Sequence, residues 1–137
     1  MNELDKQVAE KCGWEYLYVD SFPTQNDPNY NSFNPRQKEL EYWLEKVEIE
    51  NVGEYLIKVD LNTWIEPDTY KPSTNLQQAW EAYEQIYFDV LGIKFWTFYC
   101  EHKKVFAVDV STLYGLTHQT SYNSFAEALC LMVVARK

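Results

Sequence analysis

The sequence predicts an α+β fold in which helices pack on a mixed or antiparallel β-sheet in α-β-α layers. Two observations carry this prediction. Stretches with apolar residues every three to four positions, as in amphipathic helices, alternate with short aromatic-rich stretches in which apolar residues recur at every second position, as in strands. The segments follow in the order α, β, α, β, α, β, β, α, without an internal repeat. A chain of 137 residues with 46% hydrophobic content can bury one core, so we expect a single domain over residues 1–137.

The first part of the chain predicts a short helix, a strand and a long loop. Asn2 is suited to cap the helix and Gly13 to end it. Residues 14–19 (WEYLYV) have the period of a strand without a clearly polar face, so this strand is expected to be covered on both sides. Residues 20–34 are polar and contain two Pro, which predicts a surface loop of a length that is often functional.

A second helix and a second strand follow. Asn34 and Pro35 mark the start of a helix that runs to about residue 47 and has an acidic outer face. Residues 54–61 (EYLIKVDL) alternate between apolar and polar positions, which is typical of a half-covered strand.

The most clearly specified element is the turn and helix between Trp64 and Gly92. Pro67 and Pro72 interrupt regular pairing, and Thr74 or Asn75 can cap the helix that follows, with Gln77 or Gln78 completing a capping box. The apolar residues of this helix lie on one stripe, and Gly92 is expected to end it; they are Leu76, Ala79, Trp80, Tyr83, Tyr87, Val90 and Leu91.

The last part predicts a hairpin, a connection and a closing helix. Residues 93–100 and 104–110 flank a short polar turn and are expected to pair as antiparallel strands. Residues 111–123 are polar and predict a connection. Ser124 and Glu127 form a capping box at the start of an apolar helix.

Charge and composition exclude several classes of function. Twelve Lys and Arg against 21 Asp and Glu give a net charge of -9, which disfavours direct binding of nucleic acid. The acidic excess either serves solubility or presents carboxylates to a protein that normally grips nucleic acid. Aromatic residues make up 17% of the chain, and some of them are expected to face a partner rather than the core.

Motifs for metal, cofactor or nucleophile chemistry do not occur in the sequence. Its three cysteines are widely spaced and suit reduced thiols, and neither His102 nor His118 lies at metal-ligand spacing. Both histidines are expected in solvated turns or loops, and a carboxylate pair of Asp60 and Asp109 is the weak candidate for acid-base work. We therefore expect no enzyme, no cofactor and no metal. The start of the chain lacks an apolar run and no segment has the length of a membrane span, so an intracellular protein is expected.

Two capped helix starts, at residues 72–75 and 122–124, lie beside aromatic residues in the sequence. Helix N-termini carry unpaired N–H groups that suit phosphate, and aromatic rings can stack on a base. The predicted ligand-binding residues are aromatic platforms, helix-start residues and cations: Trp64, Tyr70, Tyr122, Ser73, Thr74, Asn75, Ser124, Arg36, Lys103, Lys104 and Arg136.

Three separated pieces of the chain resemble the small proteins of bacteriophages and prophages that carry a phage ABA sandwich domain. The pieces are EKCGWEYL near the start, the turn and helix from Trp64 to Ile86, and SFAEALCLMVVARK at the end. The family shows Gly-Trp after a first helix, a Trp and a Pro before a Ser-Thr-Asp turn, and an Ala-Trp helix. The matching positions are Gly13, Trp14, Trp64, Ser73, Thr74, Ala79, Trp80, Cys130 and Leu131, and Asn75 replaces the usual Asp.

The resemblance implies a phage-encoded accessory protein that acts in the cytoplasm of the host bacterium. Small phage proteins of this layout include the Thoeris anti-defence proteins, oligomers that bind a cyclic ADP-ribose signal from a host enzyme and hold it uncut. The implied function is sequestration of a cyclic nucleotide signal by a homo-oligomer without turnover. The alternative is an acidic protein inhibitor, similar to an anti-CRISPR, that uses the helix at 35–47 and residues 48–54 to block a host defence effector that binds nucleic acid. The segment at 20–53 is longer than in short members of the family.

Overall fold

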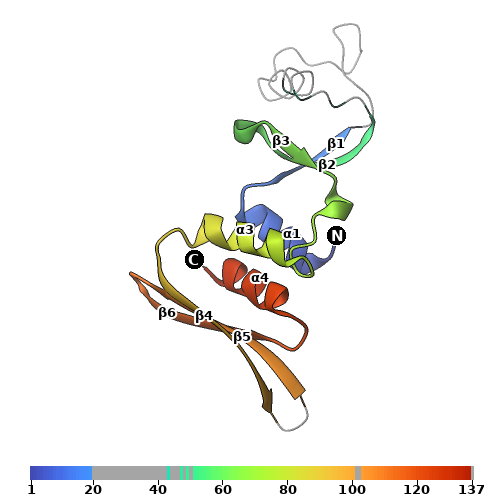
Figure 1. The fold of residues 1–137 in the computed structure, drawn as a ribbon. Helices are drawn as coiled ribbons and strands as arrows, with labels where there is room; N and C mark the ends of the chain where they lie inside the picture. Colours follow the sequence, from blue (N-terminus) through green and yellow to red (C-terminus); the bar gives the residue numbers. More distant parts are fainter. Residues whose placement is uncertain (20–42, 44–46, 48, 50, 101–102, 137) are drawn as a thin grey trace, which may run out of the picture. The chain divides into compact units, whose positions relative to one another are not determined.

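The computed structural model describes residues 1–19, 43, 47, 49, 51–100 and 103–136 (Figure 1). It confirms the α+β class, because the described residues form α-helices and two antiparallel three-stranded sheets. Contacts divide the chain into two compact units. Unit 1 comprises Met1–Gly13 with Asp68–Lys137, and unit 2 comprises Trp14–Pro67.

Unit 1 is built on the sheet of β4 (Val90–Cys100), β5 (Lys103–Thr112) and β6 (Gly115–Ser121), in the order β4-β5-β6. Figure 1 shows α4 (Phe125–Ala135) on one face of this sheet, with α1 (Glu3–Lys11) and α3 (Leu76–Ile86) beyond it. Because α4 lies between the sheet and the other two helices, it contacts protein on most of its sides. Six residues of α4 are accordingly buried: Ala126, Ala128, Leu129, Cys130, Met132 and Val133.

The hairpin prediction is confirmed, whereas the connection predicted for residues 111–123 is wrong. β4 pairs with β5 in antiparallel register, and residues 115–121 form a further strand, β6, which pairs with β5. β6 is not predicted from the sequence because its residues are largely polar. An edge strand is held by backbone hydrogen bonds to its neighbour and does not need alternating apolar residues. Leu113 and Tyr114 form the turn between β5 and β6.

The start of α3 is confirmed, and its capping box is not. The side chain of Asn75 accepts a hydrogen bond from the Gln78 amide at 3.1 Å. The Gln78 side chain reaches further back, since it accepts from the Lys71 amide at 2.7 Å and donates to the Thr69 carbonyl at 2.8 Å. It therefore fixes the preceding turn rather than the cap residue.

The predicted end of this helix at Gly92 is also wrong, because α3 ends at Ile86 and Val90 begins β4. Tertiary contacts hold the chain at this point. The Arg136 guanidinium donates to the Ile86 carbonyl at 3.1 Å and to both oxygens of Asp89, and the Tyr87 hydroxyl donates to the Met132 carbonyl at 2.6 Å. The bond from Arg136 satisfies the Ile86 carbonyl, a group at the helix end that the local sequence leaves open.

Unit 2 contains the sheet of β1 (Glu15–Val19), β2 (Gly53–Lys58) and β3 (Thr63–Ile65), in the order β1-β2-β3. The strand predicted over residues 54–61 is too long, because Val59–Leu61 form the 3-10 helix η1 and Leu61 is 68% exposed. Asn62 follows with a φ of 50°, in the left-handed region that Asn adopts more readily than most residues, and the chain reverses there into β3.

The strand predicted at residues 14–19 is confirmed as β1, but it is not covered on both sides. Tyr16 and Tyr18 point to the same face and are 54% and 61% exposed. The opposite face packs on a small core made of Trp43, Ile49, Tyr55, Ile57, Leu17 and Val47. The predicted loop at 20–34 lies outside the described residues, as does the helix at 35–47 apart from Trp43 and Val47.

Candidate functional site

The starts of all three helices of unit 1 meet at Ser73, which is 4% exposed. The Ser73 amide donates to the carboxylate of Asp5 at 2.8 Å, and its hydroxyl accepts from the side chain of Asn2, the cap of α1, at 3.2 Å. The hydroxyl of Ser124, the cap of α4, donates to the Ser73 carbonyl at 3.3 Å. The two helix starts singled out in the sequence therefore lie side by side in the structure.

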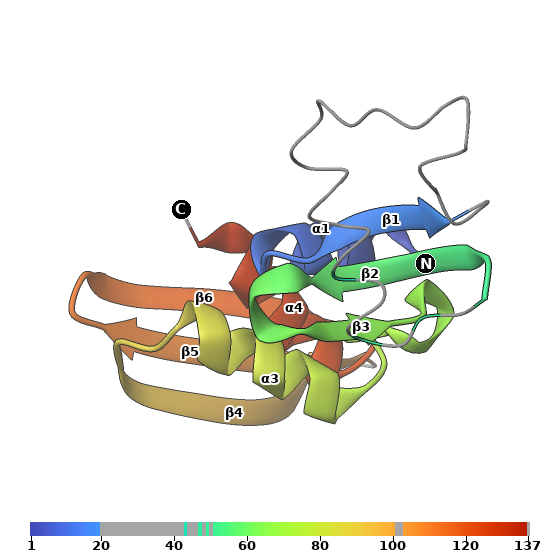
Figure 2. The ribbon, with the colours of Figure 1, turned by 90° about the horizontal axis from the view of Figure 1, so that it is seen from above.

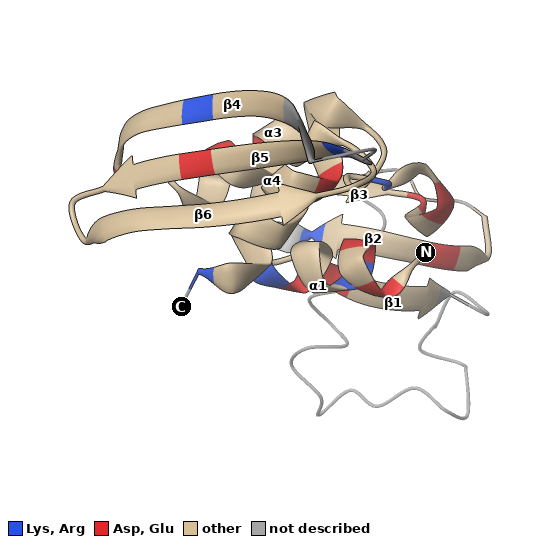
Figure 3. Cartoon of the chain, turned by 90° about the horizontal axis from the view of Figure 1, so that it is seen from below, with Lys and Arg blue, Asp and Glu red and all other residues tan. Residues whose placement is uncertain are grey.

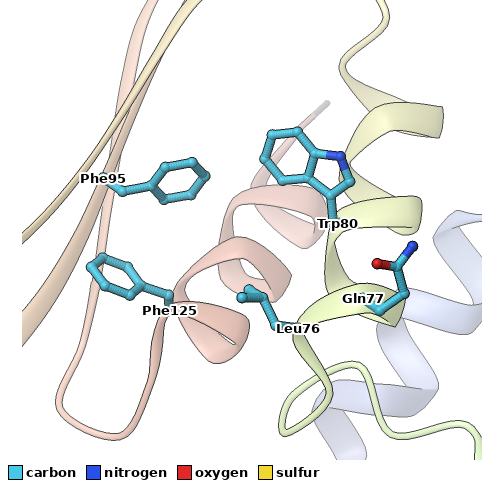
Figure 4. Close-up of a pocket in the computed structure, with 5 residues that line it drawn as sticks. All are labelled: Leu76, Gln77, Trp80, Phe95 and Phe125. Atoms are coloured by element: carbon cyan, nitrogen blue, oxygen red, sulfur yellow. The ribbon is translucent and has the colours of Figure 1, made fainter.

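A hollow of about 560 Å³ opens next to these helix starts. Its lining residues come from α3, β4 and α4, and they are Leu76, Gln77, Trp80, Phe95 and Phe125 (Figure 4). This volume is in the range of small-molecule pockets, which are typically apolar with a few polar groups at defined positions. Gln77 is the polar side chain of the lining.

The three aromatic rings of the hollow face a common space (Figure 4). The centroids of Trp80 and Phe95 lie 5.9 Å apart, and Phe95 meets Phe125 edge-on at 5.7 Å. The Trp80 indole N–H donates to Glu84, which orients that ring. Since Phe95 remains 42% exposed, a flat ring can enter from solvent and stack.

Backbone N–H groups of the lining residues add a site for negative charge. In α3 the side chain of Asn75, the cap residue, accepts a hydrogen bond from the Gln78 amide. In α4 the Ser124 hydroxyl accepts one from the Glu127 amide at 3.1 Å. The first two amides of each helix, including those of Leu76, Gln77 and Phe125, make no hydrogen bond within the described part of the chain. Amides at a helix start carry partial positive charge, which favours an anion at that end of a helix.

The capping box predicted for Ser124 and Glu127 forms only in one direction. The Ser124 hydroxyl accepts from the Glu127 amide, as predicted. The Glu127 carboxylate instead accepts from the hydroxyl of Ser121 at 3.0 Å and from the side chain of Asn123 at 2.9 Å and 3.0 Å. This carboxylate therefore braces the end of β6 against the start of α4.

Lys104 is the predicted cation that the structure brings nearest to this region. Its ammonium lies 4.7 Å from the centroid of the Phe106 ring, and Phe106 meets Phe125 edge-on at 4.9 Å. The ammonium is thus two rings away from the hollow, at the end of a flexible and exposed side chain. Arg36 and the side chain of Lys103 lie outside the described residues.

The other predicted site residues are distributed differently. Tyr70 is buried, with 5% of its surface exposed, whereas Thr74 is exposed and donates to the Lys71 carbonyl at 3.4 Å. Tyr122 is 67% exposed and does not line the hollow. Trp64 belongs to unit 2, where it meets Tyr55 edge-on at 5.3 Å.

Arg136 lies at the C-terminal end of α4, away from the helix starts, and forms a two-pronged ion pair with Asp89 at 2.5 Å and 2.8 Å. This hydrogen-bonded pair lowers the pKa of Asp89 and raises the pKa of Arg136. Its guanidinium is engaged within the protein, unlike the ammonium of Lys104.

The sequence patterns single out one aromatic residue of the hollow, Phe125, which lies beside the second helix start and could stack on a base. They predict Trp80 only as part of the apolar stripe of its helix and Phe95 only as a strand residue. The one local signal was that Leu76 and Phe125 directly follow cap residues, which places large apolar side chains at two helix starts. Their meeting depends on how α3, α4 and β4 pack.

A second pair of interacting residues lies on the sheet. His118, expected in a loop, is on β6, and its Nδ1 lies within hydrogen-bonding distance of the carboxylate of Asp109 on β5, opposite Lys94 of β4 in the register. Asp60, the expected acid-base partner of Asp109, belongs to η1 of unit 2. Among the described residues, no group of three or more His, Cys, Asp or Glu is placed to hold a metal ion.

No protein-family model, curated protein or solved structure matches this chain, so the resemblance to the phage ABA sandwich proteins stays a prediction. Within the described ranges, no helix combines the length and apolar character that crossing a bilayer requires.

Proposed function

We propose that this protein binds a cyclic nucleotide signal, such as a cyclic ADP-ribose, and holds it without turnover. In this proposal the protein is phage-encoded and acts against a defence system in the host cytoplasm, as the resemblance implies. The observation that carries the binding proposal is the aromatic hollow at the paired starts of α3 and α4.

The hollow offers one group for each part of a nucleotide. The base stacks among Trp80, Phe95 and Phe125, where one base–aromatic stack contributes about 1–3 kcal/mol. The phosphates lie at the free amides of the two helix starts, and the Lys104 ammonium, two rings away from the hollow, is the nearest of the predicted cations that the structure describes. Gln77, whose amide nitrogen donates to Glu81 at 3.1 Å, leaves its carbonyl oxygen to accept from a base or a ribose.

Holding without cleavage is supported by the chemistry of the lining. Four of the five lining residues are apolar or aromatic, and the fifth is an uncharged amide. None of the five can act as a nucleophile or as a general base at neutral pH. A ligand in the hollow is therefore bound but not attacked by these side chains.

Isothermal titration calorimetry with cyclic ADP-ribose, linear ADP-ribose and ATP tests this proposal. Phe95→Ala removes one ring of the hollow, and Trp96→Ala is its matched control. Both residues are on β4 and are 42% exposed, but successive strand residues point to opposite faces. We expect Phe95→Ala to weaken binding by about 5- to 150-fold, which corresponds to ~1–3 kcal/mol, and Trp96→Ala to leave the affinity unchanged.

Mass spectrometry of the small molecules released by heat from protein purified beside an active signalling enzyme tests retention. An intact cyclic nucleotide in stoichiometric amount is the expected result. A linear product would contradict holding without turnover. No ligand in either experiment would move support to the alternative, an acidic inhibitor of a host defence protein, which rests on the net charge of -9.

A further inference from the structure

Five large apolar side chains are strongly exposed at the end of unit 1 where β5 turns into β6. This end patch consists of Phe88 (86% exposed), Leu91 (68%), Leu113 (71%), Tyr114 (86%) and Leu116 (73%). The strand register brings its segments together, since Val90 pairs with Thr112, Thr112 with Gly115, and Ser111 with Leu116. The turn of this hairpin and the start of β4 lie at the same end of the sheet in Figure 2.

The turn residues of the end patch are chemically unusual. Tight hairpin turns favour Gly, Asn, Asp and Pro, because these residues suit the backbone and leave no apolar surface in water. Here Leu113 and Tyr114 occupy the turn, and Gly115 next to them has a φ of 131°. Gly115 supplies the positive φ at the end of the turn, so the backbone of the turn does not require Leu and Tyr at positions 113 and 114.

A β-bulge adds a further apolar side chain to the end patch. The register of β4 on β5 shifts between Val90 and Gly92, and Leu91 is the residue left without a partner in the pairing. Bulges redirect a side chain relative to the regular pleat. Leu91 is 68% exposed rather than packed under the helices.

A hollow of about 410 Å³ lies beside the protruding turn. Its lining includes Tyr87, Tyr114, Leu116, Ala135 and Arg136. The charge of Arg136 is compensated by Asp89, and none of the five end-patch residues is charged. Figure 3 shows this end of β5 and β6 without Lys, Arg, Asp or Glu.

We propose that the end patch is the interface with a second copy of this chain, related by a two-fold axis. Each copy offers strongly exposed apolar side chains, such as Phe88 and Leu113, and a hollow lined by Tyr114 and Leu116, so the apolar side chains of one copy can fill the hollow of the other. This is the self-complementarity that a two-fold interface requires. Side chains of this size and exposure present on the order of 700 Å², near the ~800 Å² per partner of a stable interface.

The charge of the chain also favours a second copy over other occupants. A basic protein partner of a chain with net charge -9 would be recognised through carboxylates, and an anionic membrane through Lys and Arg. The end patch contains neither carboxylates nor Lys or Arg side chains. A neutral apolar contact is instead the place where two copies with the same negative charge can approach each other.

Sedimentation equilibrium of the full chain, over a range of concentrations, tests the proposal with a matched pair of variants. Tyr114→Lys places a charge in the end patch, and Tyr122→Lys makes the same change at an exposed tyrosine beyond the other end of β6. We expect the wild type and Tyr122→Lys to have twice the 16.3 kDa mass of the chain, and Tyr114→Lys to have the mass of one chain. Circular dichroism checks that both variants are folded.

Three outcomes would overturn the proposal. A monomeric wild type at all concentrations excludes the second copy, and co-sedimentation with phosphatidylcholine vesicles that is lost in Tyr114→Lys would then assign the end patch to a membrane. A dimer that persists in Tyr114→Lys places the interface elsewhere. Growth into larger assemblies would indicate a head-to-tail contact, which forms open assemblies and not a closed two-fold dimer. Because the aromatic hollow lies within one chain, nucleotide binding by monomeric Tyr114→Lys separates this proposal from the proposed function.

Discussion

The hydroxyl of Ser124 donates a hydrogen bond to the carbonyl of Ser73 at 3.3 Å, across 51 positions of the sequence. The same hydroxyl accepts from the Glu127 amide and thereby caps α4. One side chain thus starts a helix and ties that start to the turn before α3. The aromatic hollow lies where these two helix starts meet, so its shape depends on this contact.

Replacing Ser124 separates its two roles. Ser124→Ala removes both the cap and the tie, and we expect a loss of about 1 kcal/mol in the free energy of unfolding for the cap alone. Ser124→Asp keeps an acceptor for the cap but cannot donate to the Ser73 carbonyl. Urea unfolding should show Ser124→Asp close to the wild type, while calorimetry shows weaker ligand binding. Equal destabilisation of the two variants would indicate that the tie, not the cap, dominates stability.

Asp5 holds the junction of the helix starts from the side of α1. Its side chain is 2% exposed and accepts from the buried amide of Ser73 at 2.8 Å. Asp5→Ala leaves this amide without a partner, which costs about 1–3 kcal/mol. Asp5→Asn retains an acceptor oxygen and should lose less. Thermal unfolding of both variants checks the order, and an equal loss in the two variants would show that the charge, which both remove, matters more than the hydrogen bond.

The ion pair of Asp89 and Arg136 predicts a dependence of stability on pH. The hydrogen bond from Arg136 lowers the pKa of Asp89 below its ordinary value of 3.8. A carboxyl group whose pKa is lower in the folded state stabilises the fold above its unfolded pKa, and this contribution is lost as the pH falls through the folded value. We expect the melting temperature of the wild type to exceed that of Asp89→Asn at pH 6, and this difference to shrink below pH 3.8. A difference that stays constant to pH 2 would contradict this origin.

Cys130 is predicted to be unreactive in the folded protein. It is fully buried in α4, and desolvation raises the pKa of its thiol to about 12. The thiolate is the reactive form, so its population at pH 8 is very small. Mass spectrometry after treatment with iodoacetamide should find Cys130 unmodified in native protein and modified in urea. Rapid labelling under native conditions would mean that α4 opens frequently.

Local backbone rules made much of the secondary structure predictable. Asn2, Thr74 or Asn75, and Ser124 are predicted as caps because a short polar side chain before an apolar run satisfies the amides of a helix start. The structure has Asn2, Asn75 and Ser124 in these positions. The hairpin of β4 and β5 followed from two apolar runs around a polar turn. The errors lie where contacts between residues distant in the sequence decide, as at the end of α3, where Arg136 bonds to Ile86 and Tyr87 bonds to Met132.

The sequence by itself determined the α+β class, the helix starts and the capacity for aromatic stacking, because these depend on residues a few positions apart. Only the tertiary structure decided which aromatic rings meet. Trp80, Phe95 and Phe125 come from three elements, and they converge because α3 and α4 start at the same point and β4 passes beside them. A hollow is the space that packed elements leave between them, and that space depends on helix docking and strand register over long separations, which no local pattern encodes.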